Sequence, residues 1–310
     1  MKELSIYCNA DFPATAQALF QQSTAGHRVA ATLAEADVAL GQPNVDGVIA
    51  SARLRWVQLT SAGYTNYDRD DVRAALKARD AALTKSSLVF DEPCAEHLLA
   101  FFYAQARQLP QALEEQRGAR GWPQKTVRSR SRLLRGQSAL IAGLGSIARR
   151  LIELIAPLGM ELTVMRRQVV GDEPVRAVAW DSAEAVRALG DADHVLNILP
   201  AAPATDGFFS AARLQAMKKG AIFYNIGRGT TVDQAALIAA LTTGHIGAAY
   251  LDVTTPEPLP PEDPLWTAPN CFITPHAAGG HDDESVRLVR HFLDNLARFS
   301  SGQPLIDRVV

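Results

Sequence analysis

Three polar residues, Arg228, Glu257 and His276, each follow a short apolar run in the C-terminal half of the 310-residue chain. The runs are AIFYNI, IGAAYLDV and CFIT, and each gives way to Gly, Thr or Pro, which favour turns. Ligands of open α/β sheets bind at the carboxyl edge of the strands. The spacing therefore predicts that the ends of three strands bring these side chains to one site.

The three residue types suit a substrate that has both a carboxylate and a carbonyl group. Arg228 could hold a carboxylate through two parallel hydrogen bonds. The imidazole of His276 could exchange a proton with the carbonyl or hydroxyl oxygen near neutral pH. A carboxylate from Glu257 beside it would fix the tautomer of the ring and stabilise its charged form. Together they predict a site for hydride transfer to an oxo acid.

Length and composition limit the class of ligand. At 310 residues the chain exceeds the usual size of one domain, so we expect two domains with separate cores. Hydrophobic residues make up 47% and charged residues 21%, as in an ordinary globular protein, and the net charge is -2. This charge gives no general attraction to nucleic acid or to an anionic membrane. We expect a small-molecule ligand, with no nucleic-acid or membrane partner.

The cysteines and the N-terminal segment predict a location. Cys8, Cys94 and Cys271 are too few and too widely spaced for a disulfide framework or a zinc site, so we expect a reducing compartment and no bound metal. The first residues contain too few apolar side chains for a signal peptide, and no run approaches the ~18 apolar residues of a membrane span. These features predict a cytoplasmic protein.

Alternating strand and helix patterns form two blocks. The first, from LSIYC to AALTKSS, predicts a small flavodoxin-like α/β domain. A long helical pattern leads out of it from about Pro93, and Pro110 should kink or end part of that helix. Six strand-like runs from Ser138 predict a doubly wound parallel sheet of the Rossmann type, and a last helix should return to the first domain. We expect a substrate domain of residues 1–98 and 284–310 and a cofactor domain of residues 99–283.

A glycine-rich loop joins the first strand and the first helix of the second block. Gly143 would permit the tight turn, and Gly145 would let the backbone approach a pyrophosphate at the start of the helix. Ala148 occupies a position where the fingerprint accepts glycine or alanine. This strand, loop and helix context predicts a dinucleotide site, with Ser146 and Ile147 among its contacts.

The end of the next strand predicts which dinucleotide binds. An NAD site would place Asp or Glu there to bind the ribose 2′-hydroxyl. This chain has Arg166 and Arg167 instead, with no carboxylate from Met165 to Val170. Two cations would suit a 2′-phosphate, so we predict that NADP(H) is preferred and that NAD(H) is possible. In the alternative interpretation the two arginines merely end a surface strand.

A basic segment without acidic residues, RGARGWPQKTVRSRSRLLRG, precedes the first strand of the second block. We expect a solvated connector; the alternative is that some of its arginines attract an anionic cofactor or substrate. Because no recognition module or row of aromatic residues accompanies the charges, nucleic-acid binding is not expected. The cations are Arg117, Arg120, Lys125, Arg128, Arg130, Arg132 and Arg135.

From about Leu54 to Gly280 the chain resembles the D-isomer-specific 2-hydroxyacid dehydrogenase family. The block ILPAAPATDGFFSAARLQAMKKGAIFYNIGRGTTVDQAALIAAL resembles the family's Pro-rich loop and Arg-Gly block, and LDVTTPEPLPPEDPLWTAPNCFITPHAAGG resembles its Glu and His blocks. The short N-terminal domain and the paired arginines resemble the glyoxylate and hydroxypyruvate reductase branch. Thr254 and Ala202 replace the Phe and Thr of many members, which leaves details of the nicotinamide and substrate pockets open.

The resemblance implies roles for matching residues. Arg228 matches the carboxylate-binding arginine, Glu257 the partner acid and His276 the acid/base. SAGYTNYD resembles the family's substrate loop, so backbone N–H groups at Ala62 and Gly63 would contact the substrate carboxylate. The implied activity is NAD(P)H-dependent reduction of a small 2-oxo acid to the D-2-hydroxy acid, in a homodimer. Further cofactor contacts are implied at Leu199, Pro200, Ile226, Gly227, Ala278 and Asp252, the last near the nicotinamide amide.

Two other functions are compatible with this fold. A nucleotide-binding corepressor-like protein would lack significant turnover, and the intact trio argues against it. A formate dehydrogenase would want Gln in place of Glu257, which is not what the chain has. We expect the remaining histidines to be structural or exposed, with His97 on a helix face; these are His27, His97, His194, His245, His281 and His291.

Overall fold

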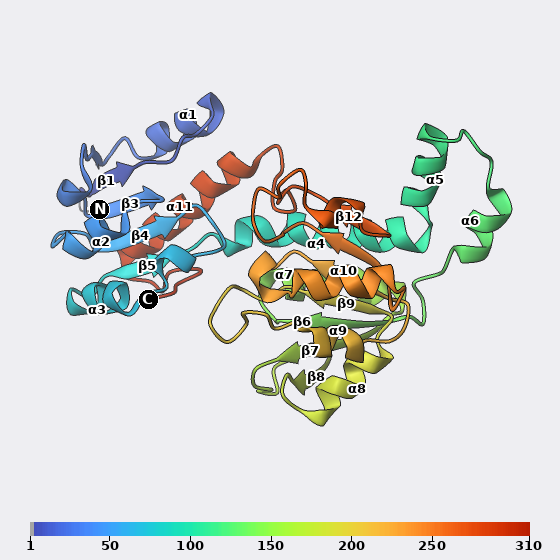
Figure 1. Cartoon of the computed structure of the whole chain (residues 1–310). Helices are drawn as coiled ribbons and strands as arrows, with labels where there is room; N and C mark the ends of the chain where they lie inside the picture. The colour runs from blue at the N-terminus through green and yellow to red at the C-terminus, as the bar shows by residue number, and fades with distance from the viewer. Residues whose placement is uncertain (1–2) are drawn as a thin grey trace. The chain divides into compact units, whose positions relative to one another are not determined.

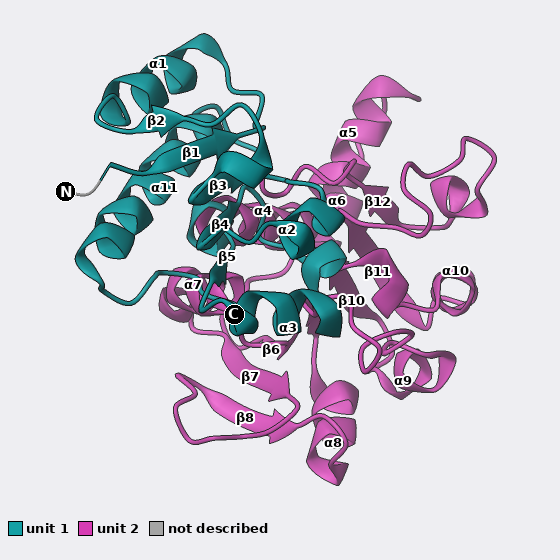
Figure 2. Ribbon diagram, turned by 90° about the vertical axis from the view of Figure 1, so that its left-hand side faces the viewer, with its two compact units in different colours: residues 1–90, 280–310 teal, residues 91–279 magenta. Residues whose placement is uncertain are grey.

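Figure 1 shows the computed structural model, which describes residues 3–310. The chain divides into two compact units, residues 1–90 with 280–310 (unit 1) and residues 91–279 (unit 2), coloured separately in Figure 2. Each unit has its own parallel sheet, which confirms the predicted α/β class. The expected domain boundaries are after residues 98 and 283, and the first change of unit lies inside one continuous helix of residues 87–106.

Unit 1 contains a five-stranded parallel sheet with its helices. Its elements are β1 (Ser5–Cys8), α1 (Ala14–Ser23), β2 (Arg28–Val29), η1 (Leu33–Glu35), β3 (Val38–Gly41), α2 (Val45–Ala50), β4 (Trp56–Leu59), η2 (Thr65–Tyr67), α3 (Asp70–Ala78), β5 (Ala82–Thr84) and α11 (Glu284–Ser301). The strand order is β2-β1-β3-β4-β5, which is the flavodoxin-like order.

Apolar side chains pack on both faces of the unit 1 sheet, as expected for parallel strands that are covered on both sides. Leu40 of β3 belongs to a cluster with Trp56 and Phe292, and the rings of Trp56 and Phe292 stack with centroids 5.2 Å apart. Its neighbour Ala39 belongs to a separate cluster with Val57, as the alternation of side chains along a strand requires. Since Phe292 lies on α11, the last helix packs on the first domain as predicted.

Unit 2 contains a seven-stranded parallel sheet with the order β12-β11-β10-β9-β6-β7-β8. Its helices before the sheet are α4 (Ser87–Ala106), which begins in unit 1, α5 (Leu109–Arg117) and α6 (Gln124–Arg130). The following elements are β6 (Ser138–Ala142), α7 (Ser146–Ile155), η3 (Ala156–Leu158), β7 (Glu161–Arg166), β8 (Arg176–Ala179), α8 (Ala183–Asp191), β9 (His194–Asn197), α9 (Ala211–Ala216), β10 (Ala221–Asn225), η4 (Gly229–Thr231), α10 (Gln234–Thr242), β11 (Ile246–Leu251), η5 (Pro264–Thr267) and β12 (Cys271–Ile273).

The order of the unit 2 sheet is the Rossmann order with one additional strand, and the chain reverses direction across the sheet between β6 and β9. Six of the strands coincide with the six predicted runs. The sequence pattern missed β8, because this edge strand is short and only one of its side chains is fully buried. None of the described helices is long and apolar enough to cross a membrane.

The long helix predicted from Pro93 is two helices. α4 begins before Pro93, contains this proline and ends at Ala106. Gln108 then adopts a left-handed conformation, with a φ angle of 55°, and α5 begins at the next residue. Pro110 lies in the first turn of α5, where its missing N–H would have had no helical partner. The expected break therefore occurs before Pro110, and this proline starts a helix.

Candidate active site

The three strands that precede the predicted trio are neighbours in the unit 2 sheet. β10, β11 and β12 are adjacent and parallel. Their last residues are level, because Leu251 pairs with Asn225 on one side and with Ile273 on the other. The three loops that bear the trio therefore leave the sheet at one carboxyl edge, as the spacing predicts.

His276 and Glu257 are hydrogen-bonded to each other. Nδ1 of the imidazole lies 2.7 Å from Oε2 of Glu257, and the backbone N–H of Thr254 donates to Oε1 at 3.0 Å. An ionised carboxylate only accepts, so we assign the ring proton to Nδ1, which leaves Nε2 for a substrate. The His276 side chain is 51% exposed and that of Glu257 is 37% exposed, so a ligand can reach the pair.

Asp252 organises the loop that bears His276. Its side chain is 2% exposed. Oδ1 accepts the hydroxyl of Thr274 at 2.6 Å and the backbone N–H of Ala277 at 2.8 Å, and Oδ2 accepts the N–H of Ala278 at 2.9 Å. The N–H of His276 donates to the Asp252 carbonyl at 2.8 Å. These bonds hold His276 at a φ angle of 51°, a left-handed conformation that non-glycine residues rarely adopt.

Arg228 has no carboxylate partner among residues 3–310. Its Nη1 donates to the neighbouring Gly227 carbonyl at 2.6 Å, while its own carbonyl accepts the hydroxyl of Thr231 at 2.6 Å. The following glycine is required by packing, since a Cβ atom on Gly229 would lie 1.9 Å from the carbonyl oxygen of Thr254. The backbone around Arg228 is thus held by close contacts, and most of its guanidinium donors stay available for an anion.

The glycine loop has the geometry of a dinucleotide site. Gly143 follows β6 with a φ angle of 100°, which disfavours any side chain, and Gly145 caps the start of α7. Ala148, in the first turn, is fully buried, which explains the small residue at this position. A cavity of about 300 Å³ beside the loop is lined by Gly143, Leu144, Arg166, Arg167, Gln168, Val170, Trp180 and Leu199.

The two arginines after β7 have different surroundings. Nη1 of Arg166 lies 2.8 Å from Oε1 of Glu173 and 3.2 Å from Oδ1 of Asp172. Backbone N–H groups, first that of Val170, hold the pKa of Glu173 below its usual value, so this partner is charged. Arg167 instead lies over the ring of Trp180 at 5.2 Å, with no acidic partner in the described part of the chain. These two acids, Asp172 and Glu173, closely follow the segment from Met165 to Val170, which contains no carboxylate.

The remaining predicted contacts lie in loops at strand ends. Leu199 and Pro200 follow β9, Ile226 and Gly227 follow β10, and Ala278 belongs to the loop that bears His276. Ala62 and Gly63 belong to unit 1, in the partly exposed loop after β4, where the Ser61 hydroxyl donates to the Gly63 carbonyl at 2.6 Å. Contact of all these residues with a ligand stays a prediction.

His97 joins this set, although the sequence pattern indicated only a place on a helix face. It lies on α4, and its Nε2 is 3.1 Å from Oγ1 of Thr274 and 3.9 Å from Oδ1 of Asp252. His97 and Thr274 are separated by 177 positions in the sequence, so no local motif connects them. The periodicity of the helix placed the residue correctly but gave no sign of its partner.

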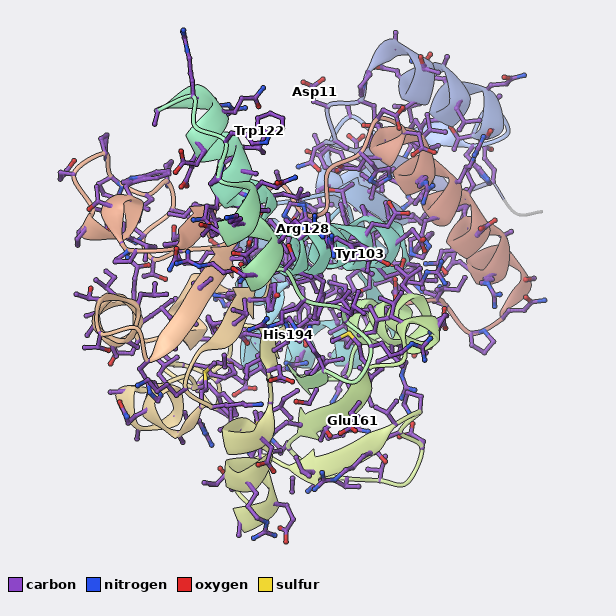
Figure 3. All side chains as sticks on the ribbon, turned by 90° about the vertical axis from the view of Figure 1, so that its right-hand side faces the viewer. Asp11, Tyr103, Trp122, Arg128, Glu161 and His194 are labelled. Carbon is purple, nitrogen blue, oxygen red and sulfur yellow. The ribbon has the colours of Figure 1, made fainter. Side chains whose placement is uncertain are left out.

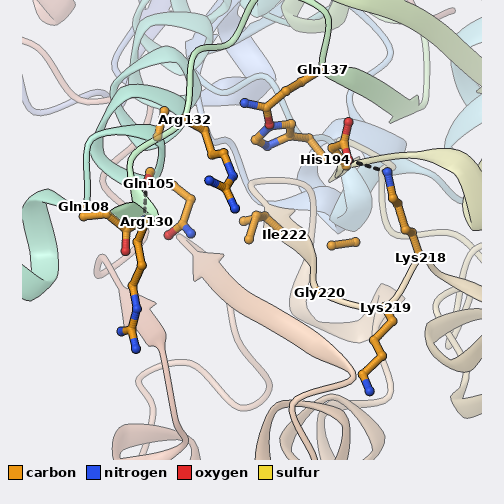
Figure 4. A pocket seen from close by; sticks show the side chains of 13 residues that line it. Gln105, Gln108, Arg130, Arg132, Gln137, His194, Lys218, Lys219, Gly220 and Ile222 are labelled. Atoms are coloured by element: carbon orange, nitrogen blue, oxygen red, sulfur yellow. Dashed lines mark hydrogen bonds and ion pairs between the residues drawn. The ribbon is translucent and has the colours of Figure 1, made fainter. Parts of the chain in front are cut away.

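Two arginines of the basic segment line a cavity other than the one beside the glycine loop. Figure 3 shows Arg128 on α6 and Trp122 just before this helix. Arg130 and Arg132 line a different cavity of about 400 Å³, together with Lys218, Lys219 and His194 (Figure 4). This cavity lies at the amino ends of the strands, since β9 begins at His194. Arg130 and Arg132 are thus placed away from the glycine loop, and a role of the segment in attracting an anionic cofactor or substrate stays a prediction.

No group of three His, Cys, Asp or Glu side chains in residues 3–310 is arranged to hold a metal ion. The cysteines of this part of the chain form no disulfide bond. Cys94 is buried, and its burial raises the pKa of the thiol to about 12. The described carboxyl edge therefore presents an acid/base pair, an unpaired cation and a glycine loop.

Known proteins resemble this chain along most of its length. Residues 99–278 match the family model described as D-isomer specific 2-hydroxyacid dehydrogenase, NAD binding domain. A glyoxylate reductase/hydroxypyruvate reductase of Mus musculus is 34% identical over 232 residues, which cover 73% of this chain and 68% of that protein. Glyoxylate/hydroxypyruvate reductase B of Citrobacter koseri is 32% identical over 255 residues, which cover 81% and 76%.

Solved structures also resemble this chain, and one example covers both units. It is a D-isomer specific 2-hydroxyacid dehydrogenase from Xanthobacter autotrophicus Py2 in complex with NADPH and MES. The TM-score is 0.83 at 26% sequence identity, and the match covers 100% of this chain and 98% of that one. The similarity therefore extends over both units.

Proposed function

The chain belongs to the D-isomer specific 2-hydroxyacid dehydrogenase family, and we propose that it reduces a small 2-oxo acid to the D-2-hydroxy acid, with NADPH preferred over NADH. Membership of this family makes it an NAD(P)-dependent oxidoreductase. The proposed substrates are glyoxylate and hydroxypyruvate, for which the relatives from Mus musculus and Citrobacter koseri are named.

One observation carries this proposal. The 2.7 Å hydrogen bond between His276 and Glu257 lies at the same sheet edge as Arg228, whose guanidinium has no carboxylate partner among the described residues. A proton donor and an unpaired cation are the two groups that reduction of a 2-oxo acid needs from the protein.

The chain's residues would then divide the chemistry as follows. A reduced nicotinamide, when bound, supplies the hydride for C2 of the oxo acid. Arg228 binds the carboxylate and polarises the neighbouring carbonyl. Protonated His276 donates its Nε2 proton to the oxygen that becomes an alkoxide, while Glu257 holds the ring through Nδ1 and stabilises the imidazolium. Asp252, proposed to lie near the nicotinamide amide, keeps the His276 loop folded.

The cofactor proposal rests on the loop after β6 and the arginines after β7. The turn at Gly143 and the N–H groups at the start of α7 suit a pyrophosphate, which helix N-termini attract. Arg167, without an acidic partner, is the proposed main contact of the 2′-phosphate. Arg166 is a weaker candidate, because Glu173 and Asp172 already offset its charge.

The wider organisation belongs to the same proposal. Unit 2 would be the cofactor domain and unit 1 the substrate domain, with the backbone of Ala62 and Gly63 contacting the substrate carboxylate. We also propose a homodimer, which the family implies, and a cytoplasmic location, which accords with the unpaired Cys8, Cys94 and Cys271.

A substrate panel tests the proposal. We would measure oxidation of NADPH and of NADH by the purified chain with glyoxylate, hydroxypyruvate and phenylpyruvate. The expected result is turnover with at least one of the two smaller acids and a higher kcat/KM with NADPH. Negligible turnover with every acid would instead favour a nucleotide-binding module, and equal or better efficiency with NADH would contradict the cofactor preference.

A further inference from the structure

His97 lies behind the loop that bears His276, at the end of a chain of hydrogen bonds. Its Nε2 is 3.1 Å from Oγ1 of Thr274, and this hydroxyl lies 2.6 Å from Oδ1 of Asp252. Asp252 in turn accepts the N–H groups of the two residues that follow His276, Ala277 and Ala278. This series of hydrogen bonds thus links helix α4 to the backbone that directly follows the proposed acid/base residue.

The direction of each hydrogen bond follows from the number of protons. Two backbone N–H groups already donate to the Asp252 carboxylate, and an ionised carboxylate only accepts, so Thr274 gives it the single hydroxyl proton. The oxygen of Thr274 can then only accept from His97. We therefore assign the proton of the neutral ring to Nε2 of His97, which makes this histidine a donor.

The surroundings of His97 favour a fixed, neutral ring. Its side chain is 22% exposed, and the ring meets Phe101 edge to face with centroids 4.4 Å apart. Burial lowers the pKa of His97, against the opposing attraction of Asp252, so the ring is uncharged near neutral pH. A neutral ring with one N–H can donate to Thr274 without placing a second charge beside the carboxylate.

We propose that His97 is a positioning residue for the reduction: through Thr274 it orients the Asp252 carboxylate, which sets the loop geometry of His276. The inference rests on the proposed function. Its physical basis is that His276 sits in an unfavourable backbone conformation, which persists only while its surroundings hold it. Removing one donor from this series of hydrogen bonds would let the Asp252 carboxylate turn. The hydrogen bonds from the N–H groups of Ala277 and Ala278 to this carboxylate would then weaken.

The experiment compares variants of the full-length protein that keep or remove the N–H donor of His97 or the hydroxyl donor of Thr274. His97→Phe keeps a ring without the donor, His97→Gln keeps an N–H, Thr274→Val removes the hydroxyl and Thr274→Ser keeps it. We expect His97→Phe and Thr274→Val each to lower kcat for the oxo acid roughly 5–20-fold, since small misplacements of reacting groups cost up to about 10²-fold. The conservative variants should recover most of the loss.

The double variant His97→Phe/Thr274→Val identifies the route of the effect. If His97 acts through Thr274, the double variant has the kcat of either single variant; losses that multiply would overturn the proposal. So would a His97→Phe variant with a kcat within twofold of the parent, or a loss confined to thermal stability. Should His97→Phe not fold, the comparison of Thr274→Val with Thr274→Ser decides the same point.

Amide hydrogen exchange at Ala277 and Ala278 separates this inference from the proposed function. We expect faster exchange at both amides in His97→Phe than in the parent, whether or not the enzyme turns over a 2-oxo acid. A parent without turnover would refute the proposed function alone. Unchanged exchange in a folded His97→Phe variant would refute the positioning role even in an active enzyme.

Discussion

The two edges of the unit 2 sheet use the same residue types in opposite ways. At the amino edge His194 is buried, and both ring nitrogens are engaged, Nδ1 at 2.9 Å from the Tyr224 hydroxyl and Nε2 at 2.8 Å from Oε1 of Gln137. At the carboxyl edge half of the His276 side chain is exposed and only Nδ1 has a partner in the described chain. Both ring nitrogens of His194 thus have partners within the protein, whereas Nε2 of His276 remains available to a ligand.

The cations and acids at these edges repeat this contrast. Lys218, at the amino edge, is paired with Asp193 at 2.7 Å. Arg228, at the carboxyl edge, has no such partner among residues 3–310. A function can therefore be inferred where polar groups are held in place by the backbone and yet keep unused hydrogen-bonding capacity, because leaving such groups unpaired has no structural benefit.

Replacing His276 with Asn should produce the largest effect. The loss of the proton donor should lower kcat for the oxo acid roughly 10²–10⁴-fold, the usual contribution of general acid–base catalysis. Steady-state kinetics with NADPH measures it, with His194→Gln as the matched histidine replacement at the amino edge. We expect the folded His194→Gln protein to keep a kcat close to that of the parent. Retained turnover in His276→Asn would remove this residue from the mechanism.

His194 should control stability in acid. Burial lowers its pKa to about 4 from the ordinary 6.5. Between these values the unfolded chain binds a proton that the folded protein does not, so the free energy of unfolding falls as the pH drops from 6.5 to 4 and is unaffected above 6.5. The contribution is roughly 3 kcal/mol. Urea unfolding at pH 7 and pH 4 should show a smaller acid loss for His194→Gln; identical losses would show that His194 does not titrate in this way.

Arg228→Ala should separate substrate binding from cofactor binding. Loss of a charge-assisted hydrogen-bond pair should raise KM for the oxo acid roughly 10–100-fold, while NADPH affinity changes little. Arg130→Ala at the amino edge is the control, and we expect no change in either quantity. Equal losses of substrate and NADPH affinity in Arg228→Ala would indicate a structural arginine instead.

Arg166 and Arg167 differ in the same way as Lys218 and Arg228, because Arg166 has acidic partners and Arg167 has none among the described residues. Arg167→Gln should lower kcat/KM with NADPH about tenfold and leave NADH nearly unchanged, since an unpaired cation is available to a phosphate. Arg166→Gln should have a smaller effect, below about threefold, because an ion pair already offsets this charge. Parallel kinetics with both cofactors measures the ratio, and a larger loss in Arg166→Gln would reverse the assignment.

The parts of the site that could be predicted depend on local sequence. The trio and the Gly143 loop follow strand-like runs, and parallel strands place their ends at one edge whatever the rest of the fold does. The contacts of His97 with Thr274 and of Arg166 with Glu173 could not be read in this way. The first joins residues 177 positions apart, and the second needs the path of a loop, which apolar periodicity does not specify.

Isotope transfer tests the central claim, that the carboxyl edge of unit 2 serves hydride transfer to a 2-oxo acid. The purified chain would be incubated with NADPH carrying two deuterium atoms at C4 of the nicotinamide and with hydroxypyruvate, and the product analysed by mass spectrometry and chiral separation. We predict a D-2-hydroxy acid with one deuterium at C2. An undeuterated product, an L-2-hydroxy acid, or no product would contradict the claim.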